Sequence, residues 1–347
     1  MSPDRPDYPL RLTIDAAALA DNWRALDRLS GKASAGAAVK ADGYGLGARR
    51  VVPLLWEAGC RTFFVAHWVE AAELLDLVPP ASIAVLHGPL SAQDAAFGRA
   101  AGLRPVLNSL AQARLWQAAG GGQCDLMVDT GINRLGLPLS DLRDPLITGL
   151  AVDTLHSHLA CAEEQSPLNA LQRNRWLEAC QQVPHRAASL ANSAGIMLGA
   201  DYHGGLTRPG LALYGGVPCA ALARHTKQVA YPEAQLIQRR RVQPGDTIGY
   251  NATFTAPAPM EVGVVSLGYA DGYLRAWSNL GSFHWGEHHL PVVGRVSMDM
   301  TVVDLSAAPG LSEGDWVGLD YALPAASRRS GLSQYELLTM LGRRFAR

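Results

Sequence analysis

The sequence predicts a (β/α)8 barrel followed by a smaller domain of mainly antiparallel strands. From about residue 13 to residue 228, short apolar runs alternate with amphipathic stretches, which is the pattern of strands and helices around a parallel sheet. From about residue 233 the pattern changes to short alternating segments broken by Gly, Pro and Asp, as expected of antiparallel strands. We therefore expect a barrel domain over residues 13–228 and a β domain over residues 229–347, with residues 1–12 packing against the β domain.

The barrel domain contains eight candidate strands, each of them a short apolar run. In chain order these runs end at or near Lys40, His67, His87, Asn108, Asp129, His158, Ser193 and Gly215. Helical patterns separate the runs, for example over residues 16–30 and 169–183. In a (β/α)8 barrel the chemistry is placed on the loops that follow the strands, so the ends of these runs are where a site is expected.

The β domain is expected to contain short strands within residues 234–250, 258–273, 289–305 and 313–319. Its final segment, residues 333–347, has the pattern of a terminal helix with Tyr335 near its start. Basic residues would then occupy the last turns of that helix, where the helix dipole favours positive charge.

Composition narrows the class of partner. The chain of 347 residues is 48% hydrophobic and 18% charged, and its formal net charge is -1, so nothing indicates binding to nucleic acid or to an anionic membrane. The N-terminal segment is charged and proline-rich where a secretory signal would be apolar, and no later run approaches membrane-spanning length. We expect a cytoplasmic protein whose five scattered cysteines are reduced and whose partners are small molecules and a second copy of itself.

Lys40 stands out among the strand ends. The segment AAVKADGYGLG places this lysine at the end of an apolar strand, directly before a glycine-rich turn. An ammonium group is costly to bury, so such a lysine either pairs with an acid or serves as a neutral amine, for instance in a Schiff base. On its own, a lysine that extends to solvent at the rim of the barrel explains the pattern equally well.

AAVKADGYGLG also resembles the lysine motif of the alanine racemase family, whose members use pyridoxal phosphate (PLP). Further segments resemble family segments in the family order over nearly the whole chain: DTGINRLG, HSHLACAEE, LANSAG, LTRPGLALYGG, DTIGYNATFTA, GYADGYLRAWSNLG, VVGRVSMDM and QYELL. An ordered series of this kind is far more specific than one motif. The resemblance implies a PLP-dependent isomerase that interconverts L-alanine and D-alanine, a peptidoglycan precursor, and that forms a head-to-tail homodimer.

The resemblance assigns two proton carriers. It implies that Lys40 holds PLP as a Schiff base and carries the proton of the D enantiomer, while Tyr250 serves the L enantiomer from the opposite face. Tyrosine ordinarily titrates near pH 10, so Tyr250 would need a nearby positive charge or hydrogen-bond donor to act as a base. Without Lys40 in the same chain, Tyr250 would be interpreted as an edge-strand aromatic.

Arg208 and His158 are the other two residues with implied catalytic roles. Arg208 matches the arginine that faces the pyridine nitrogen, and because an arginine does not surrender its proton, that nitrogen would stay largely unprotonated, which suits racemisation. His158 matches the family histidine that sits against the cofactor and links to the arginine or the tyrosine. Alone, each has an ordinary structural interpretation, as a surface arginine and a core histidine.

The remaining implied contacts hold the phosphate and the substrate. The phosphate is assigned to Tyr44, Ser193, Gly210, Leu211 and Tyr335, with Gly210 and Leu211 acting through their backbone N–H groups. Asn192 is also counted among the cofactor-binding residues. Read alone, Asn192 and Ser193 would be an ordinary turn or cap.

Four residues are implied to bind or select the substrate. Arg134 would reach the phenolic oxygen of the cofactor and the substrate carboxylate, and Met298 would offer its backbone N–H to that carboxylate. In the family Tyr250, Met298 and Asp299 enter the active site of the partner. Tyr269, together with Tyr335, narrows the entrance, and two bulky rings near the substrate methyl favour alanine.

The chain departs from the family pattern near Arg134. Many members have a lysine, often carbamylated, two residues before the Asp of DTG, whereas this chain has Met127. A thioether cannot form the salt link to Arg134, so a bound anion or a neighbouring polar group would have to orient the guanidinium.

Metal binding is not expected. The segment HWGEHH contains His284, Glu287, His288 and His289 but lacks the HExxH spacing, and we interpret it as a solvated turn. In HSHLAC, strand alternation would place His156 and His158 on one face and Cys161 on the other.

Three alternatives remain open. A noncatalytic PLP carrier would share the barrel and the lysine motif but needs no second domain. A decarboxylase would want an acid, not Arg208, opposite the ring nitrogen. A racemase of broader specificity, acting for example on serine, is the alternative that the sequence excludes least.

Overall fold

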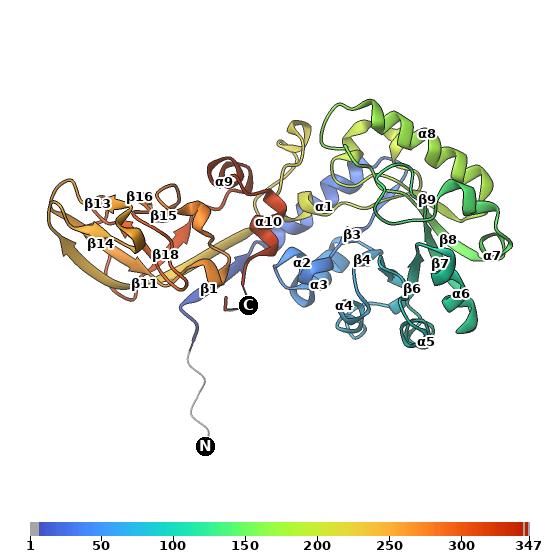
Figure 1. Ribbon diagram of the computed structural model, residues 1–347, viewed down its shortest axis with the longest axis horizontal. Coiled ribbons are helices and arrows are strands. Elements are labelled where there is room, and N and C mark those ends of the chain that lie inside the picture. Colours follow the sequence, from blue (N-terminus) through green and yellow to red (C-terminus); the bar gives the residue numbers. More distant parts are fainter. Residues whose placement is uncertain (1–6, 343, 346–347) are drawn as a thin grey trace, which may run out of the picture. The chain divides into compact units, whose positions relative to one another are not determined.

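The computed structural model describes residues 7–342 and 344–345 and divides the chain into two compact units (Figure 1). The barrel unit comprises Ala16–Lys227. The β unit comprises the described part of Met1–Asp15 together with the described part of Gln228–Arg347.

The barrel unit is built on a parallel sheet with the strand order β3-β4-β5-β6-β7-β8-β9. The strands are β3 (Ala37–Ala38), β4 (Phe63–Val65), β5 (Ile83–Val85), β6 (Arg104–Leu107), β7 (Gln123–Met127), β8 (Ala151–His156) and β9 (Ala187–Ser189). Strands such as β4 and β5 are buried at every residue, which explains why they occur in the sequence as continuous apolar runs.

Closure of the barrel corrects one predicted strand. The run ALYG was expected to be the eighth strand, but Leu211–Tyr214 forms the 3-10 helix η5. The eighth strand is β10 (Leu206–Thr207), which pairs in parallel with β2 (Ser34–Ala35). A short apolar run is compatible with a strand or with a buried helical turn, and here all four residues of η5 are buried.

Helices cover the outside of the barrel sheet (Figure 1). They are α1 (Ala16–Leu29), α3 (Ala48–Ala58), α4 (Trp68–Ala72), α5 (Ala92–Ala101), α6 (Leu110–Ala118), α7 (Pro145–Thr148) and α8 (Pro167–Gln182). The segment labelled α2 (Lys40–Tyr44) has left-handed backbone after its first residue and is not a regular helix. Ser91, Ser109 and Ser166 cap α5, α6 and α8 by accepting a backbone N–H in the first turn. Short 3-10 helices are η1 (Pro80–Ser82), η2 (Leu139–Arg143), η3 (Gly195–Leu198), η4 (Ala200–Tyr202), η5 and η6 (Ala220–Leu222).

The β unit contains an antiparallel sheet in the order β16-β15-β18-β11-β14-β17, in which β1 also pairs with β11. The strands of this unit are β1 (Leu10–Ile14), β11 (Ala230–Val242), β12 (Thr247–Ile248), β13 (Phe254–Thr255), β14 (Met260–Val265), β15 (Ser282–Trp285), β16 (His288–Pro291), β17 (Thr301–Asp304) and β18 (Trp316–Leu319). Its helices are η7 (Tyr250–Ala252), η8 (Tyr269–Asp271), η9 (Arg275–Trp277), α9 (Leu323–Ser330) and α10 (Gln334–Thr339). The predicted combination of a barrel with an antiparallel β domain is confirmed.

The C-terminal helix is shorter than predicted. Helix α10 ends at Thr339, so the basic residues that were expected in its last turns lie beyond it. Arg344 instead bonds the carboxylates of Asp271 (2.6 Å) and Asp299 (2.7 Å), while Arg343 and Arg347 lie outside the described residues. Charge pairing to these loops therefore replaces the expected dipole interaction.

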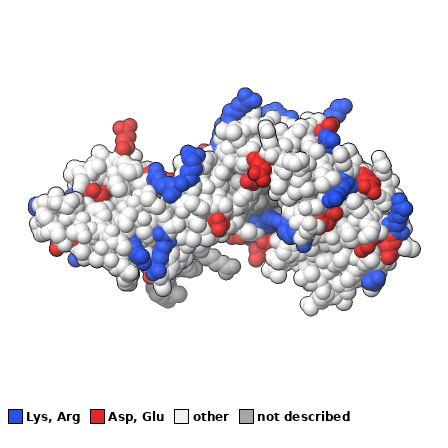
Figure 2. Space-filling view, turned by 45° about the horizontal axis from the view of Figure 1, so that its top comes forward, with Lys and Arg blue, Asp and Glu red and all other residues white. Residues whose placement is uncertain are grey.

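Lys and Arg side chains are interspersed with Asp and Glu over the face shown in Figure 2. In the described part of the chain, no helix combines the length and the apolar character needed to cross a bilayer.

Candidate active site

The residues after Lys40 form a left-handed turn. Residues 41–44 all have φ between 53° and 64°, although only one of them is a glycine. Left-handed backbone costs roughly 1–2 kcal/mol for each L-residue that has a side chain, so the turn must be held from outside. Glu70 holds it, because one carboxylate oxygen accepts the N–H of Ala41 (2.7 Å) and the other accepts the N–H of Ala66 (2.7 Å) at the end of β4.

The environment of Lys40 favours its neutral amine. Burial lowers the pKa of Lys40, and the positive charges of Arg134 and Arg208 lower it further, while Glu70 acts in the opposite direction. A depressed pKa is what a Schiff-base lysine needs, since only the unprotonated amine is a nucleophile.

Arg208 follows β10 and is almost completely buried. Its Nη1 donates to His156 Nδ1 (3.2 Å) and to Ser189 Oγ, and its Nη2 donates to the carbonyl of Ser157 (2.5 Å). Burial lowers the pKa of Arg208 to about 10, so the guanidinium is still positively charged at neutral pH. Both terminal nitrogens are engaged by the protein, whereas Nε makes no hydrogen bond within the described residues.

Arg208 is linked to His156. His158 was expected to link to Arg208 or to Tyr250, and the structure gives the link with Arg208 to His156, which is fully buried and lies 3.1 Å from Asp125. A link between His158 and Tyr250 stays a prediction. Burial, then the charges of Arg208 and Arg134, lower the pKa of His158 to about 3, so His158 is neutral among these cations. His156 is the last residue of β8, and His158 lies two positions further along the chain, beyond the end of the strand.

Tyr44, Ser193 and Gly210 lie close together in the barrel unit. Ser193 Oγ accepts the N–H groups of Gly210 (2.9 Å) and Ala212 (3.3 Å), which leaves its own hydroxyl proton to donate. A Cβ at Gly210 would lie 2.2 Å from the Tyr44 hydroxyl, so only glycine fits here. Burial raises the pKa of Tyr44 to about 12, so that its hydroxyl remains a donor.

The other residues predicted to bind the phosphate or the cofactor differ in whether their polar groups already have a partner in the protein. The Gly210 N–H points to Ser193 Oγ, whereas the Leu211 N–H has no acceptor within the described residues. The side chain of Asn192 accepts the N–H of Gly195 (2.9 Å), as a local cap would.

Arg134 lies on a loop that Asp129 shapes. One carboxylate oxygen of Asp129 accepts the N–H groups of Gly131 (2.8 Å) and Ile132 (3.1 Å). Arg134 itself is exposed and, among the described residues, forms no hydrogen bond or ion pair. Met127 is buried and supplies no charge to the guanidinium.

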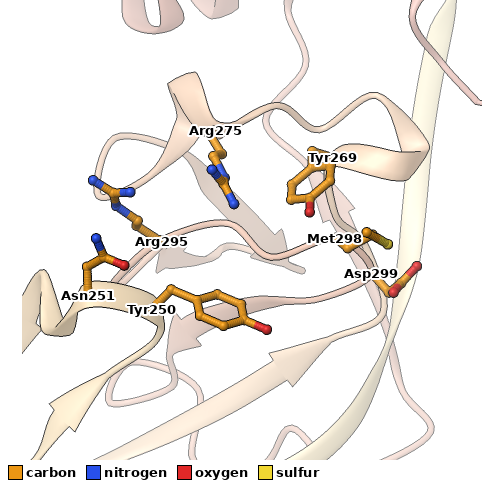
Figure 3. Close-up of a pocket in the computed structure, with 7 residues that line it drawn as sticks. All are labelled: Tyr250, Asn251, Tyr269, Arg275, Arg295, Met298 and Asp299. Carbon is orange, nitrogen blue, oxygen red and sulfur yellow. The ribbon is translucent and has the colours of Figure 1, made fainter.

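The β unit carries a separate pocket (Figure 3). It is lined by Tyr250, Asn251, Tyr269, Arg275, Arg295, Met298 and Asp299. Figure 3 shows the rings of Tyr250 and Tyr269 facing the same space, and the guanidinium of Arg275 lies 5.1 Å from the centre of the Tyr269 ring. The side chain of Tyr250 is 64% exposed, and that of Met298 is 53% exposed.

Met298, which lines this pocket, and Tyr335, on helix α10, are both exposed. The carbonyl of Met298 accepts the N–H of Ala270 (2.9 Å), and the Met298 N–H has no acceptor within the described residues. Tyr335 is exposed in the first turn of α10.

Comparisons with known proteins identify the family. Residues 14–218 match the family model for the alanine racemase N-terminal domain, and residues 229–347 match the model for the alanine racemase C-terminal domain. The chain belongs to the alanine racemase family.

Relatives and a solved structure match nearly the whole chain. Two alanine racemases of Agrobacterium fabrum, one named biosynthetic and one catabolic, are each 41% identical, over 98% and 97% of this chain and 93% and 91% of their own lengths. The alanine racemase of Bartonella henselae, solved with covalently bound pyridoxal phosphate, has a TM-score of 0.90 and 36% identity over 99% of both chains.

Several residues of these sites were missed by sequence reasoning. Arg275 and Arg295 lie in segments that had been matched to the family, but no pattern singled them out. Asp125 and Glu70 act on backbone or on other side chains across the fold, so their sequence neighbours give no signal. His156 was noticed only as part of a discounted metal motif.

Proposed function

We propose that the protein is a PLP-dependent racemase that interconverts L-alanine and D-alanine in the cytoplasm. The observation that carries this proposal is that the barrel unit holds both a desolvated Lys40 and a buried guanidinium, Arg208, whose terminal nitrogens are bound by the protein while its Nε–H is left to donate. The names of relatives at 41% identity and of the solved structure at 36% identity support it.

The barrel residues fit a phosphorylated pyridine aldehyde. Because Gly210 has no side chain, the Tyr44 hydroxyl can approach its backbone close to Ser193 Oγ, and a phosphate dianion needs such donors. We propose that these two hydroxyls, the Leu211 N–H and Tyr335 hold the phosphate, with Asn192 shaping the loop. The barrel domain of residues 13–228 would then hold PLP through Lys40, which supplies the neutral amine.

PLP, when bound, supplies an electron sink for the α-carbon. Lys40 would take or return the α-proton on one face, a role that its lowered pKa suits. Arg208 would donate Nε–H to the pyridine nitrogen and keep it from gaining a proton, because the guanidinium holds its own proton at neutral pH. His158, neutral beside these cations, would sit against the ring without adding charge.

Tyr250 would be the second proton carrier. Its phenol is 64% exposed, although a proton carrier works best where water is excluded. We infer that a second copy of the chain covers it, in a head-to-tail homodimer in which Tyr250, Met298 and Asp299 complete the site of the partner. The Met298 N–H and Arg134 would hold the substrate carboxylate.

Alanine is the substrate we favour, because Tyr269 and Tyr335 are bulky and would leave little room beyond a methyl group. The test is to measure the racemisation rate of the PLP-loaded enzyme with L-alanine, L-serine, L-lysine and L-glutamate. We expect alanine to have the highest kcat/KM. Faster turnover of serine or lysine would refute the substrate assignment, and no racemisation of any of them would refute the proposed function.

A further inference from the structure

We propose that Asp125 is a positioning residue for Arg208 and that it acts through His156, which it fixes as the neutral tautomer protonated on Nε2. This inference rests on the proposed function, in which Arg208 faces the pyridine nitrogen of PLP. It concerns two residues, Asp125 and His156, that lie behind the guanidinium and have no assigned role.

The three side chains form a continuous chain inside the barrel. Asp125 Oδ2 lies 3.1 Å from His156 Nε2, and His156 Nδ1 lies 3.2 Å from Arg208 Nη1. Asp125 and His156 are 0% exposed, and Arg208 is 7% exposed. Strands β7 and β8 supply the acid and the histidine, so neighbouring strands fix the spacing.

Donor and acceptor rules determine the tautomer. An arginine only donates, so His156 Nδ1 must accept from Arg208 and carries no proton. The proton of the neutral ring is therefore on Nε2, where it donates to the Asp125 carboxylate. Burial lowers the pKa of His156, and protonation of Nδ1 would also bring two donors and two positive charges face to face.

The other contacts of Asp125 support a positioning role. Its Oδ1 accepts the backbone N–H of Thr154 (3.1 Å), which holds the carboxylate in place. Arg104 lies 3.8 Å from Asp125 but bonds Asp153 at 2.8 Å, so Asp153 is the main ion-pair partner of Arg104. Asp125 therefore directs its hydrogen bonds toward His156 and the backbone.

The consequence for Arg208 is geometric. With His156 accepting from Nη1 and the Ser157 carbonyl accepting from Nη2, the guanidinium cannot turn, and the direction of Nε–H is fixed. Loss of the imidazole acceptor would leave Ser189 to hold Nη1 and would let the guanidinium tilt. The hydrogen bond to the pyridine nitrogen would weaken, although Arg208 itself is unchanged.

The experiment compares PLP-loaded wild type with Asp125→Asn, His156→Leu and His156→Gln. The matched control is Asp153→Asn, which removes a buried acid from the same network without touching His156. Three quantities are measured: the visible absorption of the bound cofactor and its dependence on pH, kcat and KM for alanine, and the protonation of each His156 nitrogen by 15N NMR.

We expect Asp125→Asn and His156→Leu to lower kcat by about 10- to 100-fold, with a smaller change in KM, and to shift the cofactor absorption. His156→Gln should retain most of the wild-type kcat and cofactor absorption, because its amide can accept from Arg208 and donate to Asp125. Asp153→Asn should leave the absorption unchanged, and NMR of wild type should show the proton on Nε2.

Unchanged absorption and kcat in folded Asp125→Asn would overturn the proposal, and so would a proton on Nδ1 of His156 in the wild type. If Asp125→Asn does not fold, the pair His156→Leu and His156→Gln decides, because equal loss in both would exclude a tautomer-specific role. A wild type that binds PLP but racemises no amino acid would refute the proposed function instead, and the NMR result would still stand.

Discussion

The barrel site and the β-unit pocket differ in how far their functional groups are already in place. In the barrel, Arg208 is 7% exposed and its two terminal nitrogens have protein partners, so its direction is fixed before any ligand arrives. In the β unit, Tyr250 is 64% exposed and lines an open pocket. The barrel thus resembles a preorganised electrostatic site, whereas the β unit presents groups that need a covering surface.

The two regions share one feature, which is left-handed backbone beside the proposed proton carriers. Lys40 precedes residues 41–44, all with positive φ, and Tyr250 precedes Asn251 (φ 63°) and Ala252 (φ 47°). Such residues persist only where the surroundings hold them, and they are frequent at functional sites. In the barrel the holding group is Glu70.

Replacing Lys40 should have the largest effect and would test the barrel side of the comparison. Lys40→Ala is expected to abolish both racemisation and the visible absorption of bound PLP. The chain has only three lysines, so reduction of the holoenzyme with borohydride and peptide mapping can place the cofactor unambiguously. Lys227→Ala, which removes a surface ion pair with Asp21, is the matched control and should behave as wild type. Cofactor found on Lys32 or Lys227 would contradict the account.

Replacing Tyr250 tests the β-unit side. Tyr250→Phe removes only the phenolic proton carrier and should lower kcat by about 10²- to 10⁴-fold, which is the usual contribution of a general acid or base. The cofactor absorption should not change. Tyr231→Phe, another exposed tyrosine of the β unit, should retain full activity. Release of PLP from Tyr250→Phe would show that Tyr250 binds the cofactor rather than moving a proton.

Glu70 tests whether the left-handed turn is held from outside. Glu70→Ala leaves three backbone N–H groups, those of Ala41, Ala66 and His67, without their acceptor. Unfolding by urea should show a loss of about 0.5–1.5 kcal/mol, the net contribution of a typical hydrogen bond, because these donors are exposed or only part-buried and water can reach them. Glu73→Ala, a nearby exposed position, should cost far less. Equal losses in the two variants would mean that the turn is stable without Glu70.

The smallest expected effect is a pH dependence in the β unit. The hydrogen bond that His284 donates to the Asp320 carboxylate raises the pKa of His284, so the stability from this pair is fully present below the unfolded pKa and is lost as the pH rises through the folded pKa. Both side chains are partly exposed, so the contribution is about 0.2–1 kcal/mol. The free energy of unfolding should fall less between pH 6 and pH 9 in His284→Gln than in wild type. Glu287→Gln should retain the wild-type slope.

The sequence predicted the fold well where periodicity is strong. Seven barrel strands lie within or beside the predicted runs, but the eighth was placed in ALYG because a buried 3-10 turn and a strand have the same apolar pattern. The terminal helix was extended over residues whose charges in fact serve Asp271 and Asp299. In both cases, contacts with residues distant in the sequence determined the structure, and the local pattern did not.

For the candidate site, the sequence indicated some of the residues and missed others. Lys40, Arg208 and Tyr250 were found because they lie in distinctive segments, and their catalytic roles stay predictions. Asp125, His156 and Glu70 were not found, because each acts on a group distant in sequence, such as Arg208 or Ala41. Residues that orient other residues leave no local pattern.

The central claim is that an amine from one chain and a phenol from a partner chain act on one substrate. It can be tested by mixing Lys40→Ala with Tyr250→Phe, each inactive alone, under conditions that exchange subunits. A mixed dimer would contain one site with both proton carriers and one with neither, so activity should recover to about a quarter of that of wild type. If the mixture stays as inactive as its parts although mixed dimers form, Tyr250 does not act on the substrate held by the partner's Lys40, and the account is wrong.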